Sequence, residues 1–303
     1  MNKIQYISKS QIDSSKWDEC IINSINSRIY AHSWYLDLVS KNWGAFIYGN
    51  YELVFPVVYA NRFFYKKIYH PNFCQQLGPF SPDANLLFDD NIIYDLFNVI
   101  NNKYSQFFFS INFDCVKVVK NIIINRGLNI NYVTRINLEL NLKLNYKQLY
   151  SHYSENISRN LKACNELNFY IKSIDDVSAF IFFYKKYISQ KANLKSSDLK
   201  LIKSIIQSSM KKKYGSMYAL FDNSNNIVAA AFFISYLDRE VLLFNFSTKK
   251  FKFNAMVKLI DYYIQLNASQ NKWLDFEGST IPGLMRFYKG FGASEKNYLL
   301  ISK

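Results

Sequence analysis

The order of helical and extended segments in residues 168–303 limits the possible folds more than any other feature of the chain. Residues 168–174, NFYIKSI, alternate apolar and polar side chains as a half-buried strand does. Apolar side chains then recur every three or four residues in 177–188 and in 199–210, which predicts two helices. The later patterns predict strands at 218–222, 227–237, 240–247, 272–279 and 296–302, and helices at 253–264 and from Pro282 onward.

The resulting order, β-α-α-β-β-β-α-β-α-β, predicts a mixed α/β (α+β) sheet. The first half repeats this pattern less clearly, with helices expected near 17–27, 31–40, 92–100 and 116–125 and strands between them. Four of the five prolines lie between residues 56 and 82, so we expect HPNFCQQLGPFSP (70–82) to be an ordered loop or a strand edge. A chain of 303 residues is long enough for two domains of ~100–200 residues. We therefore predict tandem domains, 1–145 and 146–303.

Composition excludes several classes of protein. Half of the residues are apolar, which is ample for a folded core. The four cysteines lie far apart and form no CxxC pair, so neither a zinc site nor any other metal site is expected. The longest apolar run, 227–237, is shorter than the ~20 residues of a membrane span and predicts a buried strand. The first residues carry no signal-peptide pattern, so we expect a cytoplasmic protein.

The basic charge is concentrated in the second half. Residues 1–145 carry 14 basic and 11 acidic side chains, whereas residues 146–303 carry 23 and 12. Nine lysines and one acid lie between Lys185 and Lys213. Such a surface attracts phosphates, although a solvated helix face that only aids solubility explains a run of lysines equally well.

A resemblance enters with the closing stretch DFEGSTIPGLMRFYKGFG (275–292), which holds four of the nine glycines. The predicted element order is that of the GNAT acetyltransferase fold, and the segment ending in FYKGFGA resembles the C-terminal signature of FemAB-like proteins. QQLGPFSP (75–82) and YSENISRNLKACNELNF (153–169) are similar to two further segments of that family. The resemblance implies a tandem-GNAT acyltransferase that moves an acyl or aminoacyl group to an amine acceptor. It implies acyl-CoA or aminoacyl-tRNA as phosphate-bearing co-substrate and no permanently bound cofactor.

The same resemblance suggests roles for individual residues. Lys289 matches the lysine of the family motif, which implies that it binds a donor phosphate or stabilises the oxyanion, and Tyr288 beside it is a candidate for binding substrate. Arg159 and Lys162, three residues apart on one predicted helix face, are candidates for binding the phosphates of a substrate. The loop STKKFKFNAM lacks the glycines that hold coenzyme A in many GNAT enzymes. Its lysines and the next helix N-terminus could still hold a pyrophosphate, which makes candidates of Lys249, Lys250, Asn254 and Ala255.

Two carboxylates are the candidate bases. In a strand over 272–278, the two-residue period places Asp275 and Glu277 on one face, where shared negative charge would raise one pKa towards that of a useful base. Either carboxylate could instead pair with a lysine or cap the helix at Pro282. Gly290 and Gly292 are expected to end that helix with positive φ.

Three functions remain open from the sequence. The first is the acyltransferase, with Lys289, Glu277 and Asp275 as catalytic candidates. The second is a non-catalytic nucleic-acid-binding protein that uses the basic face Lys185–Lys213. The third is a degenerate GNAT pair that serves as a scaffold.

Overall fold

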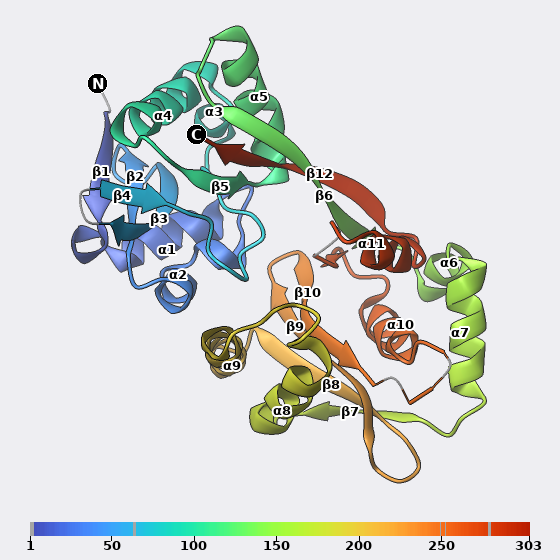
Figure 1. Ribbon diagram of the computed structural model, residues 1–303. Coiled ribbons are helices and arrows are strands. Elements are labelled where there is room, and N and C mark those ends of the chain that lie inside the picture. The colour runs from blue at the N-terminus through green and yellow to red at the C-terminus, as the bar shows by residue number, and fades with distance from the viewer. Residues whose placement is uncertain (1–2, 63–64, 249, 252, 278–279) are drawn as a thin grey trace. The chain divides into compact units, whose positions relative to one another are not determined.

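The computed structural model describes residues 3–62, 65–248, 250–251, 253–277 and 280–303 (Figure 1). The chain forms two compact units, one of Met1–Ile136 with Asn297–Lys303 and one of Asn137–Lys296. The expected domains, 1–145 and 146–303, differ from these units at the boundary and at the C-terminus. The last residues join the first unit because Leu299–Ser302 pair antiparallel with Phe108–Ile111, which satisfies the backbone of both segments.

The first unit combines β-strands with helices. Strands β1, β2, β3 and β4 form an antiparallel sheet in that order. The elements of this unit in chain order are β1 (Ile4–Ser8), α1 (Ser14–Asn23), α2 (Ser33–Val39), β2 (Trp43–Tyr48), β3 (Leu53–Arg62), β4 (Tyr65–Ile68), α3 (Ala84–Leu87), α4 (Asp90–Lys103), β5 (Phe108–Ile111) and α5 (Val116–Asn125). Strands β6 (Asn131–Asn141) and β12 (Ser294–Ser302) have residues in both units.

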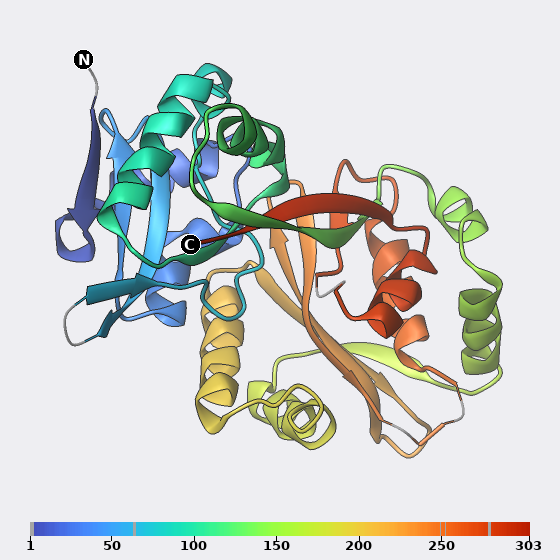
Figure 2. The ribbon, with the colours of Figure 1, turned by 45° about the horizontal axis from the view of Figure 1, so that its top comes forward.

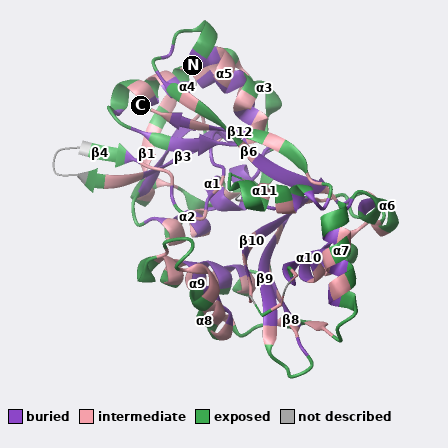
Figure 3. Cartoon of the chain, turned by 45° about the vertical axis from the view of Figure 1, so that its right-hand side comes forward, coloured by how far each residue is buried: buried purple, intermediate pink, exposed green. Residues whose placement is uncertain are grey.

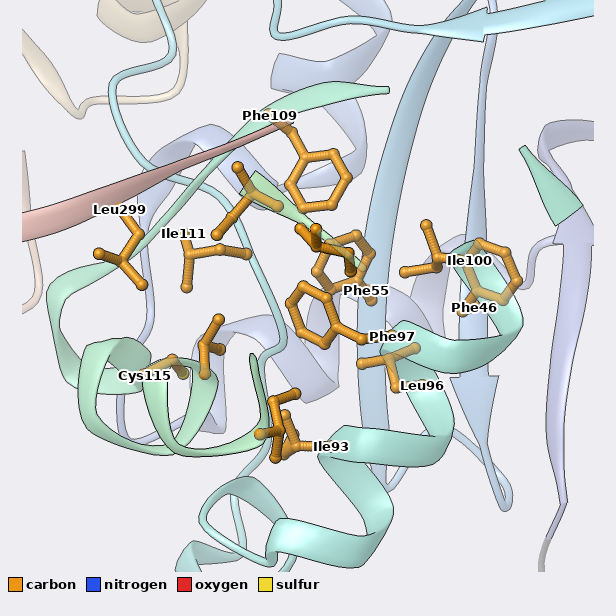
Figure 4. Packing of buried hydrophobic residues seen from close by; sticks show 14 of the residues in the cluster. Phe46, Phe55, Ile93, Leu96, Phe97, Ile100, Phe109, Ile111, Cys115 and Leu299 are labelled. Atoms are coloured by element: carbon orange, nitrogen blue, oxygen red, sulfur yellow. The ribbon is translucent and has the colours of Figure 1, made fainter. Parts of the chain in front are cut away.

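The core of the first unit lies between its sheet and α4. Phe55 of β3 contacts Phe97 of α4 and Phe109 of β5 edge to face, with ring centroids 5.9 and 5.3 Å apart (Figure 4). Trp43 of β2 packs on Trp17 of α1 instead. The predicted ordered loop at 70–82 is confirmed, since Leu77 and Phe80 make single bridges to Ile111 and Val54.

The second unit has helices on both faces of its sheet. Its further elements are α6 (Tyr146–Ser151), α7 (Glu155–Asn165), β7 (Tyr170–Ile174), α8 (Val177–Ile188), α9 (Ser196–Lys211), β8 (Gly215–Phe221), β9 (Ile227–Tyr236), β10 (Arg239–Ser247), α10 (Met256–Asn267), β11 (Trp273–Asp275) and α11 (Pro282–Lys289). The strands lie in the order β6-β11-β10-β9-β8-β7, antiparallel except for the parallel pair β10–β11.

Successive aromatic residues of β9 point to opposite faces of this sheet. Phe232 packs on Phe244 on the side of α8, whereas the ring of Phe233 stacks on Tyr263 of α10 at 3.5 Å. Figure 2 shows α8 and α9 on one side of these strands and α10 on the other. With both faces covered, β9 is almost entirely buried (Figure 3), so the apolar run that the sequence assigned to a buried strand is confirmed as one.

Candidate functional site at the parting of two strands

Strands β10 and β11 pair over a short distance and then part. Arg239–Val241 lie opposite Trp273–Asp275 in parallel, β11 ends at Asp275, and β10 continues to Ser247. The register of β10 against β9 shifts between Leu242 and Phe244, so a bulge falls just where the strands separate. The polar side chains that follow this point are therefore the candidate site.

A buried ion network holds the paired ends together. The guanidinium of Arg239 donates to the carboxylates of Glu139, on β6, and Asp275, the latter at 3.0 Å. Asn137 Nδ2 donates to Asp275 at 2.8 Å and to Glu139 at 3.3 Å. Burial acts to lower the pKa of Arg239, but the two carboxylates outweigh it and raise that pKa. The network joins β6, β10 and β11, so it fixes the point of divergence.

The prediction that Asp275 and Glu277 lie on one face of a strand is wrong. The strand ends at Asp275, and Glu277 adopts a φ of 45°, outside the β region. Asp275 pairs with an arginine, and its Oδ1 accepts the backbone N–H of Glu277 at 3.1 Å. The pKa of Glu277 is nevertheless raised to about 8, because its carboxyl group is buried and not because a second carboxylate shares its charge.

Tyr288 and Asn245 complete a group that we call the divergence cluster, consisting of Glu277, Tyr288 and Asn245. Tyr288 is buried with its ring stacked on Phe276 at 4.7 Å, and Asn245 Nδ2 of β10 lies 3.5 Å from its hydroxyl. Burial raises the pKa of Tyr288 to about 12, the contact with Asn245 opposes that rise, and the charge of Glu277 adds to it. The charge of Glu277, which titrates near pH 8, thus acts on the hydroxyl of Tyr288, which keeps its proton at that pH. The sequence analysis did not identify Asn245, because it lies within a strand and belongs to no recognisable motif.

Lys289 ends α11 on the surface. Its ammonium pairs with the carboxylate of Glu295, and both side chains are nearly half exposed. Gly292 has the expected positive φ, 86°, but the expectation for Gly290 is wrong, since its φ is −59°. A Cβ at Gly290 would lie 2.7 Å from Ile157 Cγ1, so this position needs glycine for close approach to α7.

Arg159 and Lys162 occupy one exposed face of α7. They line a shallow cavity of about 560 Å³ together with Tyr150, Ser158, Asn165 and Glu166. Arg159 Nη2 donates to Asn156 Oδ1 at 3.0 Å, which orients the guanidinium along the helix. The two side chains are thus brought together as their spacing predicts.

The candidate phosphate loop is partly engaged by the protein itself. Lys249 lies outside the described residues, and Lys250 Nζ pairs with Asp222 at 2.8 Å. The N–H of Asn254 donates to Asn160 Oδ1 at 2.8 Å, and its own side chain accepts the N–H of Met256. Ala255 is buried at the start of α10. A phosphate here would have to replace some of these bonds.

Three further features of the described part of the chain concern metal ligands, helix hydropathy and the cysteines. No group of three or more His, Cys, Asp or Glu side chains among these residues is placed to hold a metal ion. Within the same residues no helix combines the length and apolar character needed to cross a bilayer. All four cysteines are buried free thiols, and burial raises the pKa of each.

Comparison with known proteins supports the fold. No protein-family model and no curated protein sequence matches the chain. The crystal structure of FemX matches 97% of this chain and 96% of its own with a TM-score of 0.68 at 9% identity. L-PGS from Bacillus licheniformis matches 95% of this chain and 91% of its own with a TM-score of 0.57 at 10% identity. A tandem GNAT protein from the clavulanic acid biosynthesis pathway matches 99% and 98% with a TM-score of 0.51 at 6% identity. The chain therefore has the FemAB-like, tandem-GNAT fold, as the sequence predicted.

Proposed function

We propose that this protein transfers an acyl or aminoacyl group from a thioester or tRNA ester to an amine acceptor in the cytoplasm. The FemAB-like fold supports the reaction class by analogy only. The observation that carries the proposal is the carboxyl group of Glu277. It follows the point where β10 and β11 diverge, and burial raises its pKa to about 8. A base with that pKa is matched to the removal of a proton from an amine near neutral pH.

Each member of the divergence cluster has a defined role in this reaction. Glu277 accepts the proton that the amine loses as its nitrogen attacks the donor carbonyl. The hydroxyl of Tyr288, protonated because its pKa is about 12, donates a proton to the departing sulfur or ribose oxygen. Asn245 orients the Tyr288 hydroxyl through its side-chain amide. Asp275 acts through the backbone N–H of Glu277 and is a positioning residue.

Cationic side chains then hold the phosphates of the substrates. Arg159 and Lys162 present two positive charges at one exposed cavity. Lys289 at the end of α11 and Lys250 in the loop before α10 are each partnered by a carboxylate that a phosphate could replace. The Lys289–Glu295 pair is exposed on both sides and contributes only ~0–1 kcal/mol, so exchanging its carboxylate for a phosphate is energetically feasible. Lys249, outside the described residues, remains a candidate for the same loop.

The proposal is tested by measuring product formation. The protein is incubated with an amine acceptor and with acetyl-CoA, a longer acyl-CoA or an aminoacyl-tRNA, and products are identified by mass spectrometry. With the competent donor, Glu277→Gln should lower kcat by ~10²–10⁴-fold, since it removes the base without changing the shape. The exposed Glu155 of α7 provides the control, and Glu155→Gln should leave kcat unchanged.

The pH profile separates base catalysis from a role in binding. The kcat/KM of the wild type should rise with pH through about 8 as Glu277 deprotonates, and this rise should be absent in Glu277→Gln. Unchanged turnover in Glu277→Gln, with any donor that the wild type uses, would exclude this carboxylate as the base. Absence of transfer with every donor would favour the scaffold.

A further inference from the structure

A second polar and aromatic pocket lies at the end of the second unit where β8 and β10 end and β9 begins. It has a volume of about 530 Å³. Its lining comes from α8, from the ends of β8 and β9 with the turn between them, and from the residues after β10, and it includes Phe183, Lys186, Tyr187, Asp222 and Lys250. Figure 1 shows α8 and the β8–β9 turn at this end of the unit. The pocket shares no residue with the divergence cluster.

Two aromatic rings give this pocket flat apolar walls. Phe183 and Tyr187 are one helical turn apart on α8, and their planes differ by only 2° with centroids 6.3 Å apart. Both rings also stack on the buried Phe246 of β10, each at 6.0 Å, which fixes their orientation. Each ring remains partly exposed to solvent. Fixed, partly exposed ring faces favour a planar aromatic ligand over an aliphatic one.

Positive charge borders the same walls. Lys186 is exposed on α8, and Lys250 keeps 60% of its side chain exposed while it pairs with Asp222. Asp222 is the one acid in the lining, and it also accepts the backbone N–H groups of Ser224 and Asn226, so it shapes the turn as well as holding Lys250. The lysines between Lys185 and Lys213 continue the positive surface along α8 and α9, which lie side by side.

We propose that this pocket binds a nucleotide, with its base against Phe183 and Tyr187 and its phosphate at Lys186 and Lys250. Lysines alone would attract any anion in proportion to its charge, whereas ring faces beside them select a phosphate that carries an aromatic base. Lys250 also holds a substrate phosphate in the proposed transfer, so at this residue the inference rests on that function. Phe183, Tyr187 and Lys186 take no part in the transfer, and their contribution to binding is measured separately from turnover. A free nucleotide, coenzyme A and a single strand of RNA share this chemistry, and binding measurements distinguish them.

The test compares variants of one ring with a matched ring outside the pocket. Binding is followed by fluorescence anisotropy of a labelled single-stranded oligoribonucleotide and by calorimetry with ATP and with coenzyme A. Tyr187→Leu removes the aromatic face and should weaken binding by about 5- to 150-fold, the range for loss of one stacked base. Tyr187→Phe keeps the ring and should bind within about twofold of the wild type. Phe182→Leu changes the neighbouring ring on α8, which is 63% exposed and outside the lining, and should also bind like the wild type.

Each outcome decides the proposal. Loss of binding in Tyr187→Leu with retention in Phe182→Leu supports it, and the probe that shows this pattern identifies the source of the nucleotide. Equal effects of both substitutions, no effect of Tyr187→Leu, or binding of no probe would overturn it. Inorganic pyrophosphate tests whether the nucleobase contributes to binding. If pyrophosphate displaced the bound probe as effectively as ATP does, the pocket would be an anion site without selectivity for a nucleotide. If Tyr187→Leu does not fold, Lys186→Ala provides a second test. It removes about one phosphate contact, so the slope of the logarithm of the oligoribonucleotide binding constant against the logarithm of salt concentration should fall in magnitude by about one.

Discussion

The substitution Glu277→Gln should change how the stability of the protein depends on pH. Burial raises the pKa of Glu277 from 4.5 to about 8, so the folded state disfavours the ionised carboxylate. The stabilising contribution of the protonated group is complete below pH 4.5 and is lost as the pH rises to about 8. At about 1.4 kcal/mol per pH unit, this loss amounts to at most about 5 kcal/mol. Although burial raises the pKa of the carboxyl group, Glu277 as a whole residue is only half-buried, so solvent screening should bring the measured value below this bound.

Glutamine carries no charge at any of these pH values, so it avoids the loss. We therefore expect Glu277→Gln to be more stable than the wild type at pH 9 by a few kcal/mol, and close to it at pH 4.5. Urea unfolding of both proteins from pH 4.5 to 9 measures this difference, in which the titrations of all other groups cancel. Glu155→Gln, at an exposed position of α7, should show no such trend. A difference that stays constant with pH, or that favours the wild type at pH 9, would refute the buried carboxyl on which the proposed base depends.

Two further substitutions test other parts of the site. Arg239→Met should destabilise the protein by ~3–5 kcal/mol in urea unfolding at pH 7, because it leaves the buried carboxylates of Glu139 and Asp275 without their cation; a loss below ~1 kcal/mol would contradict this. Lys289→Met should raise the KM for the donor by about tenfold and leave kcat within about twofold, because an exposed ammonium that exchanges Glu295 for a phosphate contributes to binding. A fall of 10²–10³ in kcat would instead assign Lys289 to the oxyanion.

The sequence determined the elements and their order. The helix expected at 116–125 is α5, and the periodic runs at 177–188 and 199–210 lie in α8 and α9. These predictions succeed because helix and strand periodicity is a local property, repeated over many residues of one segment. The closing motif likewise indicated the fold that the comparisons support and directed attention to Glu277 and Tyr288.

Only the tertiary structure decided what surrounds those residues. Asn137 and Asp275, which share a hydrogen bond, are 138 positions apart, and Asn245 reaches Tyr288 across 43 positions, so no local pattern announces either contact. Because β11 ends at Asp275, the two carboxylates expected on one face have different surroundings. Asp275 is ion-paired with Arg239, whereas Glu277 has a pKa that burial raises. Gly290 is required by the approach of α11 to α7 and not by its own backbone angle. Burial raises the pKa of Glu277, and ion pairs with residues distant in sequence raise the pKa of Arg239, so both shifts arise only when distant segments pack against one another.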